Sequence, residues 1–262
     1  MKIRFRSKYL KEFVEEIQYK NRNPRDFKVL EMLDDISTNP ERTLSEKTLL
    51  FRSRIISDES KINKQPNFYG FDKQGSFIPP VNATRDMRAN YRYIPYLYCA
   101  NHPYTALVEV RPRIGALVSV ATIEVVSPIR LLDFTRQNIC KRMSPAKINF
   151  FADLSALYSK PIANDDDVLD YIPTQFIAEY VKNLGYDGIA FRSSLTPELT
   201  DQDAWEYPDE LDRYNAVIFN YDKCSPIKSN VVEISHNYTE CIQVDEDPKE
   251  FIIKTSLLDK RY

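Results

Sequence analysis

Glycine is scarce in this sequence, with five residues in 262. Neither GxGxxG nor GxxxxGK followed by serine or threonine occurs, so the usual glycine-rich loops that hold nucleotide phosphates are absent. The GxSxG turn that exposes the nucleophile of many serine hydrolases is absent too. If the chain binds a nucleotide or an acyl group, it must hold it with a different arrangement of residues.

Cysteine and histidine are also rare. The four cysteines form no CxxC pair, and the two histidines, His102 and His236, have no partner at the spacing of a metal site. The sequence therefore predicts neither a zinc framework nor a dense set of disulfides, and we expect no metal. An enzyme with this composition has to use carboxylates, arginines and hydroxyls.

Long apolar runs and a charge excess of one sign are missing as well. The longest mostly apolar stretch, Gly115 to Ile123, is too short to span a bilayer, and the N-terminal residues lack the apolar core of a signal peptide. With 36 basic and 38 acidic residues the formal net charge is -2, which gives no general attraction to nucleic acid or to an anionic membrane. We expect a cytoplasmic protein that contacts neither.

Apolar spacing divides the chain into three parts. From Leu10 to Ile17 apolar residues recur on one helical face, and Asn23-Pro24 is typical of the start of a second helix, so residues 1–42 are predicted to form an N-terminal helical extension. Residues 43–235 combine short β-rich runs with inserted helices, without a regular βαβ rhythm. This pattern predicts an α+β catalytic domain, followed by a C-terminal extension over 236–262.

Helix signals within the main domain are local and clear. HPYTALVEV fits a short helix, and Ser144-Pro145 is typical of a cap and first-turn proline for a helix through about Tyr158. Another helix is expected from Thr174 to Leu184, with Gly185 just past its end. The acidic stretch from 197 to 212 is expected to be an exposed loop.

Residues suited to chemistry lie in three separated segments. LLFRSRI places Arg52 and Arg54 on one face of a strand. The segment from Arg88 to Pro112 carries Arg88 before a strand and Glu109 among apolar neighbours. GYDGIAFRSS puts Ser193 and Ser194 at the end of a strand.

Read in order, LFRSR, RANYRYIPYLYCA, ALVEVRP, YDGIAFRSS and YNAVIF resemble the Arg, Glu and Ser signature of the RES-domain family, over Leu49 to Asn220. The sequence departs from the family pattern where Tyr91 or Arg92 replaces a common glycine, and where a double serine leaves the active hydroxyl ambiguous. The resemblance implies an ADP-ribosyltransferase-like fold, with a split β-sheet that binds NAD as substrate in a cleft between two small sheets. It also implies a toxin paired with an antitoxin.

The resemblance gives each candidate residue a role. Cleavage of the nicotinamide–ribose bond leaves positive charge on the ribose, which a fixed carboxylate stabilises, and Glu109 is the candidate for that group. Arg52 and Arg88 are the candidates for holding the NAD pyrophosphate, because a guanidinium offers a planar fork to two oxygens. The remaining candidates are Ser193, with Ser194 as its rival, for the nicotinamide ribose, and Tyr69 or Tyr98 for stacking on a flat ring.

Ordinary structural explanations stay open beside these roles. Glu109 is also compatible with a solvated helix face, Arg52 with a surface ion pair to Asp58, and Ser193 with a turn. The expected activity is NAD glycohydrolase or NAD phosphorylase, with protein ADP-ribosyltransferase and a non-catalytic interaction module as alternatives. A cognate antitoxin or a second copy of the chain, in a homo-oligomer, is the expected protein partner.

Overall fold

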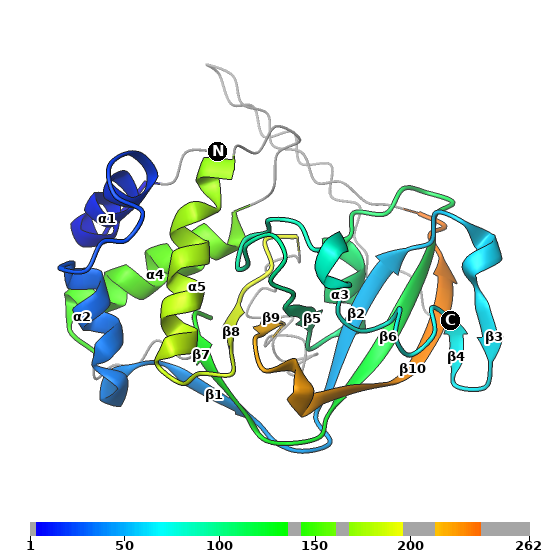
Figure 1. Ribbon diagram of the computed structural model, residues 1–262. Helices are drawn as coiled ribbons and strands as arrows, with labels where there is room; N and C mark the ends of the chain where they lie inside the picture. The colour runs from blue at the N-terminus through cyan, green and yellow to red at the C-terminus, as the bar shows by residue number, and fades with distance from the viewer. Residues whose placement is uncertain (1–3, 136–142, 161–167, 196–212, 237–262) are drawn as a thin grey trace, which may run out of the picture.

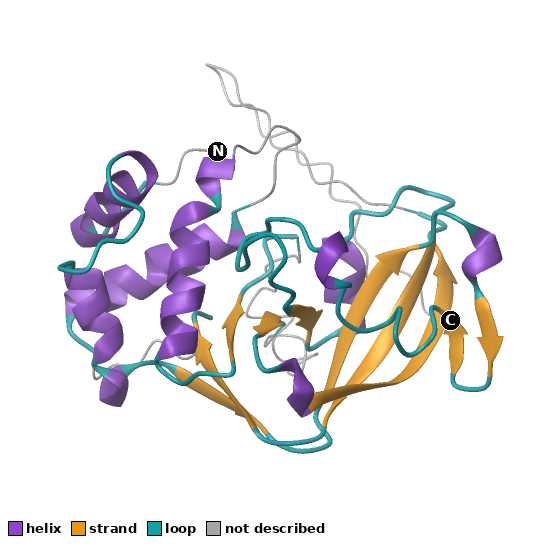
Figure 2. Ribbon diagram, viewed as in Figure 1, coloured by secondary structure: helices purple, strands orange, loops and turns teal. Residues whose placement is uncertain are grey.

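The computed structural model describes residues 4–135, 143–160, 168–195 and 213–236. The expected acidic loop at 197–212 and nearly all of the C-terminal extension lie outside these residues. Figures 1 and 2 show α1, α2, α4 and α5 gathered at one end of the molecule and strands running to the other end. The helices are α1 (Lys8–Tyr19), α2 (Lys28–Asp34), α3 (Pro103–Glu109), α4 (Pro145–Ser159) and α5 (Ile172–Asn183).

In the described part of the chain, ten strands form one hydrogen-bonded sheet in the order β1-β7-β8-β9-β5-β2-β6-β10-β4-β3. β7 and β8 pair in parallel, as do β10 and β4, and the other pairs are antiparallel. The expected α+β class is confirmed. The strands are β1 (Glu41–Leu44), β2 (Leu49–Ile55), β3 (Asn63–Gln65), β4 (Phe68–Gly70), β5 (Leu97–Ala100), β6 (Leu117–Val125), β7 (Ile129–Asp133), β8 (Gly188–Phe191), β9 (Asn215–Ile218) and β10 (Cys224–Glu233).

The sheet is nearly divided between β5 and β2. These neighbours share one register pair, Phe51 with Ala100, whereas β2 pairs with β6 along seven residues. The two small sheets implied by the family resemblance are therefore present as two halves of a single sheet, joined at one position. The space beside this joint is where the candidate site lies.

Two hydrophobic cores cover opposite faces of the half-sheet that contains β7, β8 and β9. Successive residues alternate between them: Leu132 and Val217 belong to the first core, while Leu131 and Ala216 belong to the second. Side chains of a strand point alternately to either face, so these short strands are apolar on both sides. This double burial accounts for the continuous apolar runs IRLLDF and YNAVIF.

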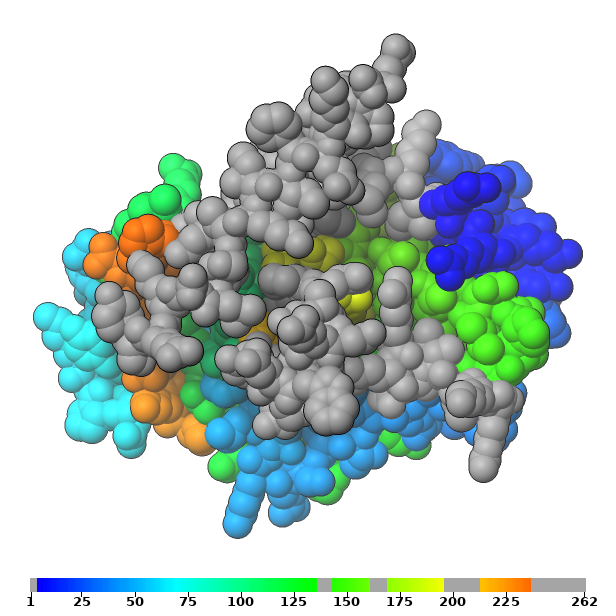
Figure 3. Space-filling model, turned by 180° about the vertical axis from the view of Figure 1, so that it is seen from behind, coloured from blue at the N-terminus to red at the C-terminus, as the bar shows by residue number. Residues whose placement is uncertain are grey.

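The N-terminal helices form part of the first core. Four buried residues of α1, from Leu10 to Ile17, pack in the same cluster as α4 and α5. The Asp153 carboxylate on α4 accepts hydrogen bonds from the backbone N–H groups of Arg6 and Ser7, each at 2.7 Å. In the back view of Figure 3 the α1 and α2 residues, in blue, lie beside those of α4, in green. The helical pair is thus integrated with the helices of the main domain.

The second helix begins at Lys28, so the start predicted at Asn23-Pro24 is wrong by four residues. The Asn21 side chain accepts a hydrogen bond from the backbone N–H of Asn23 at 2.9 Å. Such a local side-chain turn competes with helix formation at this point. The helices expected from HPYTALVEV and Ser144-Pro145 are present as α3 and α4, and the Ser144 hydroxyl accepts from Lys147 N as the cap.

Replacing Phe13 tests whether the N-terminal pair is integral to the fold. Its ring is fully buried and contacts the rings of Phe27 and Phe176, with centroids 5.8 Å and 5.5 Å away. Phe13→Ala should lower the free energy of unfolding by about 3–5 kcal/mol, measured by urea denaturation, because it leaves a cavity in the shared core. Glu12→Ala, at an exposed position on the same helix, is the control. Equal stability of the two variants would contradict the shared core.

Candidate functional site

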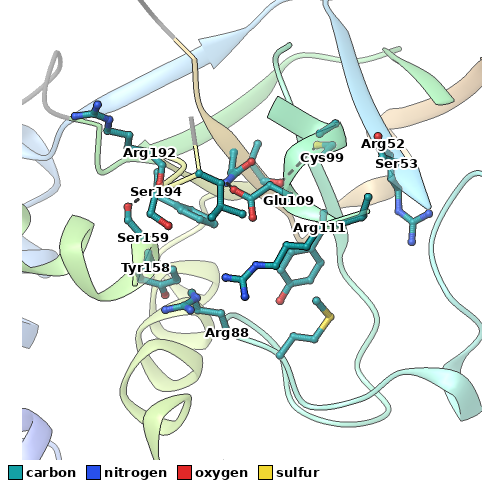
Figure 4. A pocket seen from close by; sticks show the side chains of 18 of the residues that line it. Arg52, Ser53, Arg88, Cys99, Glu109, Arg111, Tyr158, Ser159, Arg192 and Ser194 are labelled. Atoms are coloured by element: carbon teal, nitrogen blue, oxygen red, sulfur yellow. Dashed lines mark hydrogen bonds between the residues drawn. The ribbon is translucent and has the colours of Figure 1, made fainter. Parts of the chain in front are cut away.

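A pocket of about 440 Å³ lies beside the joint between the two half-sheets. It is lined by residues of β2, β5, α3, β9 and the ends of α4 and β8, so segments far apart in sequence meet there (Figure 4). Among the described residues that line it, five are basic and one is acidic. The acidic residue is Glu109, and the basic residues are Arg52, Arg88, Arg111, Lys160 and Arg192.

Glu109 is the last residue of α3, a short helix whose first turn is set by its cap. The His102 imidazole accepts a hydrogen bond from Tyr104 N at 3.2 Å, and Pro103 occupies the first turn. The Oε1 atom of Glu109 accepts two hydrogen bonds, from Ser193 Oγ and from Asn215 Nδ2, each at 2.6 Å. Two neutral donors from different segments therefore fix one oxygen of the only carboxylate among the described lining residues.

The two serines that the sequence left unresolved have different surroundings. Ser193 is buried at 1% exposure, donates to Glu109, and accepts from Leu195 N at 3.1 Å. Ser194 is exposed and lines the pocket. A hydroxyl carries one proton, so the donor of Ser193 is used by Glu109, while Ser194 faces the space a ligand would enter.

Arg52 lines the pocket from the β2 side. Its buried Nη1 has no hydrogen-bond partner among the described residues. Burial lowers the pKa of its guanidinium to about 10, with a further lowering from the Arg54 cation, so Arg52 is still charged at neutral pH. In Figure 4 the Arg52 side chain is directed away from Glu109. The structure thus brings Arg52 to the pocket without bringing its guanidinium to the carboxylate.

Arg88 is attached to the end of α4. Its Nη1 and Nη2 donate to the carbonyl oxygens of Leu157 and Lys160, groups that a helix end leaves without partners of its own. Its Cζ lies 5.9 Å from the centre of the Tyr171 ring, which also lines the pocket. Arg88 therefore holds α4 in place at the pocket wall, a role the sequence did not indicate.

The segment carrying Arg88 is fixed by a polar network. The Gln175 side chain donates to the carbonyl oxygens of Met87 and Asn90, at 3.0 Å and 2.9 Å. The Tyr98 hydroxyl donates to Asn90 Oδ1 at 2.8 Å, and burial raises the pKa of Tyr98, so the phenol stays protonated. Tyr98, one of the two predicted stacking residues, therefore lines the pocket and orders the neighbouring loop.

The other predicted stacking residue, Tyr69, is not brought to this pocket. It lies on β4, 51% exposed, and is separated from β2 in the sheet order by β10 and β6. The sequence did not reveal this distance, because the order of strands in a sheet depends on pairing between remote segments. Tyr171, which was not predicted, occupies the pocket wall instead.

Arg111 and Asn215 are lining residues that sequence reasoning missed. Arg111 has a φ of 46°, a left-handed conformation usually taken by glycine after a helix, and its N–H donates to Val108 O at 3.0 Å. Figure 4 shows the Arg111 side chain extending toward that of Arg88. A non-glycine residue in this conformation beside a pocket is a recognised sign of a functional constraint. The sequence feature that could have identified Arg111 as a pocket residue is its position directly after ALVEV.

Cysteine and metal chemistry have little support in this pocket. Cys99 lines it, but burial raises the pKa of its thiol well above the ordinary value, so the thiol is protonated. Within the described ranges, no three His, Cys, Asp or Glu side chains gather as metal ligands do.

None of the helices that the structure describes is long and apolar enough to cross a membrane.

The site is thus a carboxylate held by neutral donors in a strongly basic pocket of an α+β protein. A sequence model of the RES domain matches residues 65–229, more than half of the chain, and the protein belongs to this family. The matched segment includes Arg88, Glu109 and Ser193 and begins after Arg52. The resemblance inferred from the five segments is therefore confirmed.

No curated protein matches the sequence. Among solved structures, the crystal structure of the M. tuberculosis MbcT–MbcA toxin–antitoxin complex is similar, with 12% sequence identity and a TM-score of 0.42, over 79% of this chain and 93% of that chain.

The contacts of Arg88 give a prediction about stability. Arg88→Lys keeps the charge but loses the fork that reaches two carbonyl oxygens. We expect the free energy of unfolding to fall by about 1–3 kcal/mol, measured by urea denaturation, as for other bonds to charged groups. Arg92→Lys, at an exposed position on the same loop, should leave stability unchanged. An Arg88→Lys variant as stable as the Arg92→Lys control would show that these bonds contribute nothing to the fold.

Proposed function

We propose that the protein is an NAD-degrading enzyme that cleaves the nicotinamide–ribose bond, and that it acts as the toxin of a toxin–antitoxin pair. The observation that carries this proposal is the Glu109 carboxylate, fixed by Ser193 and Asn215 at the wall of a basic pocket. The proposal includes a cytoplasmic location for the protein, because NAD is available as a substrate there. The family membership supports the toxin role and the existence of a cognate antitoxin.

The electrostatics of the pocket suit both ends of the reaction. NAD has a dianionic pyrophosphate, and basic side chains along the wall supply attraction for it without an added metal ion. As the glycosidic bond breaks, positive charge develops on the ribose, and a carboxylate already held in place stabilises that charge more in the transition state than in the ground state. Because Ser193 and Asn215 are neutral, they orient Glu109 without cancelling its charge.

The roles of individual residues follow from their positions. Glu109 is the proposed catalytic carboxylate, and Ser194 is the hydroxyl proposed to meet the nicotinamide ribose, because it is the exposed serine of the pair. Arg111 and Arg52 are proposed to bind the pyrophosphate from different sides of the pocket. Tyr98 or Tyr171 supplies the flat surface for a ring.

Replacing Glu109 tests the reaction. Glu109→Gln keeps the shape and removes the charge, so we expect NAD turnover to fall by about 10²-fold or more, with melting temperature nearly unchanged. Turnover is measured by release of nicotinamide from purified protein. Glu46→Gln, an exposed glutamate outside the pocket, is the control and should keep full activity. A Glu109→Gln variant as active as this control would falsify the role of Glu109.

The products distinguish the possible acceptors. With NAD alone, hydrolysis gives ADP-ribose; with inorganic phosphate, phosphorolysis gives a phosphorylated ADP-ribose; with cell extract, transfer labels a protein.

The toxin role is tested by expression in a bacterial host. The parent protein should stop growth, and Glu109→Gln should not. A host that grows equally well with both would argue against the toxin role.

The two pocket arginines give a prediction about binding. Arg111→Lys should raise the apparent KM for NAD by about tenfold, equivalent to roughly 1.4 kcal/mol, because lysine keeps the charge and loses the fork. Arg52→Lys should raise it less, since the Arg52 side chain is directed away from Glu109. Arg113→Lys and Arg54→Lys are the controls, as neither residue lines the pocket. If Arg52→Lys has the larger effect, the pyrophosphate lies on the β2 side.

A further inference from the structure

Asn215 is the first residue of β9, in the half of the sheet away from β2. Its backbone is held on both sides, in register with Phe191 of β8 and Ala100 of β5. The residue is 8% exposed, and it lines the pocket. The Asn215 side chain therefore starts from a backbone position that has a paired strand on each side.

The Asn215 amide contacts Glu109 directly. Its Nδ2 lies 2.6 Å from Glu109 Oε1, a short distance for an N–H donor to a carboxylate oxygen. An arginine or lysine in this place would neutralise the carboxylate as well as hold it. A primary amide donates a proton and carries no charge, so it fixes orientation and leaves the negative charge for a ligand.

The location of Glu109 shows why such a contact is needed. Glu109 ends α3, and a negative charge at the C-terminal end of a helix faces exposed carbonyl groups of the same sign. Its side chain is exposed, so water alone would solvate the carboxylate in many orientations. Neither the helix nor burial selects one orientation, and the donors from outside α3 have to do so.

We propose that Asn215 is a positioning residue, which acts on the reaction by holding the Glu109 carboxylate toward the bond to be cleaved. This inference deepens the proposed function and rests on it. A bond to an exposed carboxylate adds little to folding stability, whereas misplacement of a catalytic group reduces turnover strongly. Asn215 should therefore influence the rate far more than the fold or the binding of NAD.

Asn215→Ala provides the direct test, because the donor is removed and nothing charged is added. We expect kcat for NAD cleavage to fall by about tenfold or more, with KM within about threefold of the parent value. Asn215→Asp, nearly identical in shape, replaces the donor by a carboxylate that repels Glu109 and should lower kcat at least as much. If Asn215→Ala does not fold, the same criterion applies to Asn215→Asp. A kcat within threefold of the parent in a folded variant overturns the proposal.

Asn220 offers a matched control. Its Nδ2 donates to the Asp187 carboxylate at 2.7 Å, the same kind of bond at a place outside the pocket. Asn220→Ala should lower the melting temperature and leave kcat unchanged, the reverse of what is expected for Asn215→Ala. If both variants lose stability and keep kcat, Asn215 is a structural residue.

Two further measurements separate this proposal from the proposed function. In a Glu109→Gln background, Asn215→Ala should cause no further loss of turnover, because a residue that acts through Glu109 has nothing left to position. In crystal structures, the Glu109 carboxylate should leave its parental position in Asn215→Ala and keep it in Asn220→Ala. An unmoved carboxylate overturns the positioning role whether or not the protein consumes NAD. A moved carboxylate in a parent protein that does not consume NAD supports the contact and refutes the proposed reaction.

Discussion

The joint between β5 and β2 is the constraint on which the pocket depends. Two strands that pair along their length leave no room between them, because neighbouring strands lie about 4.8 Å apart. Here a single pair, Phe51 with Ala100, holds the halves together, and the strands then diverge. Side chains of β2 and β5, including Arg52 and Tyr98, line the space that opens. The pocket is thus a consequence of incomplete pairing between β5 and β2.

The wall of this space is kept in shape by bonds to backbone groups more than by pairs of charged side chains. Arg88 reaches the carbonyl oxygens at the end of α4, and Gln175 holds the loop that carries Arg88. Such bonds satisfy groups that burial would otherwise leave without partners, and among the described residues that line the pocket five are basic and one is acidic. The arrangement combines a rigid wall with a field that attracts anions. Arg52, whose buried Nη1 has no hydrogen-bond partner among the described residues, is the clearest example of a basic side chain in that wall.

Local patterns in the sequence predicted much of the fold and part of the site. The caps before α3 and α4 lie within a few residues of the helices they start, so Ser144-Pro145 could be interpreted directly. Glu109 was predicted from its position in ALVEV, one of the segments that resemble the family signature, and the structure places it at the pocket wall. The contact of Asn215 with Glu109 joins residues 106 positions apart, and no local spacing encodes it. Tyr69 was misplaced for the same reason, since strand order is decided by remote pairing.

The segments that match the family signature also contain residues that stabilise the fold. A match to such a segment therefore does not by itself identify catalytic residues. In YDGI, Asp187 faces inward, where burial alone would raise the pKa of its carboxyl. Bonds from Lys223, Arg130 N and Asn220 outweigh that effect and lower the pKa. The Cβ of any residue replacing Gly188 would meet Val217 O at 2.4 Å, so no larger residue fits against β9. These two residues bring β8 against β9, and that pairing places Ser193 and Asn215 around one carboxylate oxygen. Asp187 and Gly188 therefore contribute to the geometry of the site through the pairing of β8 with β9, although neither residue lines the pocket.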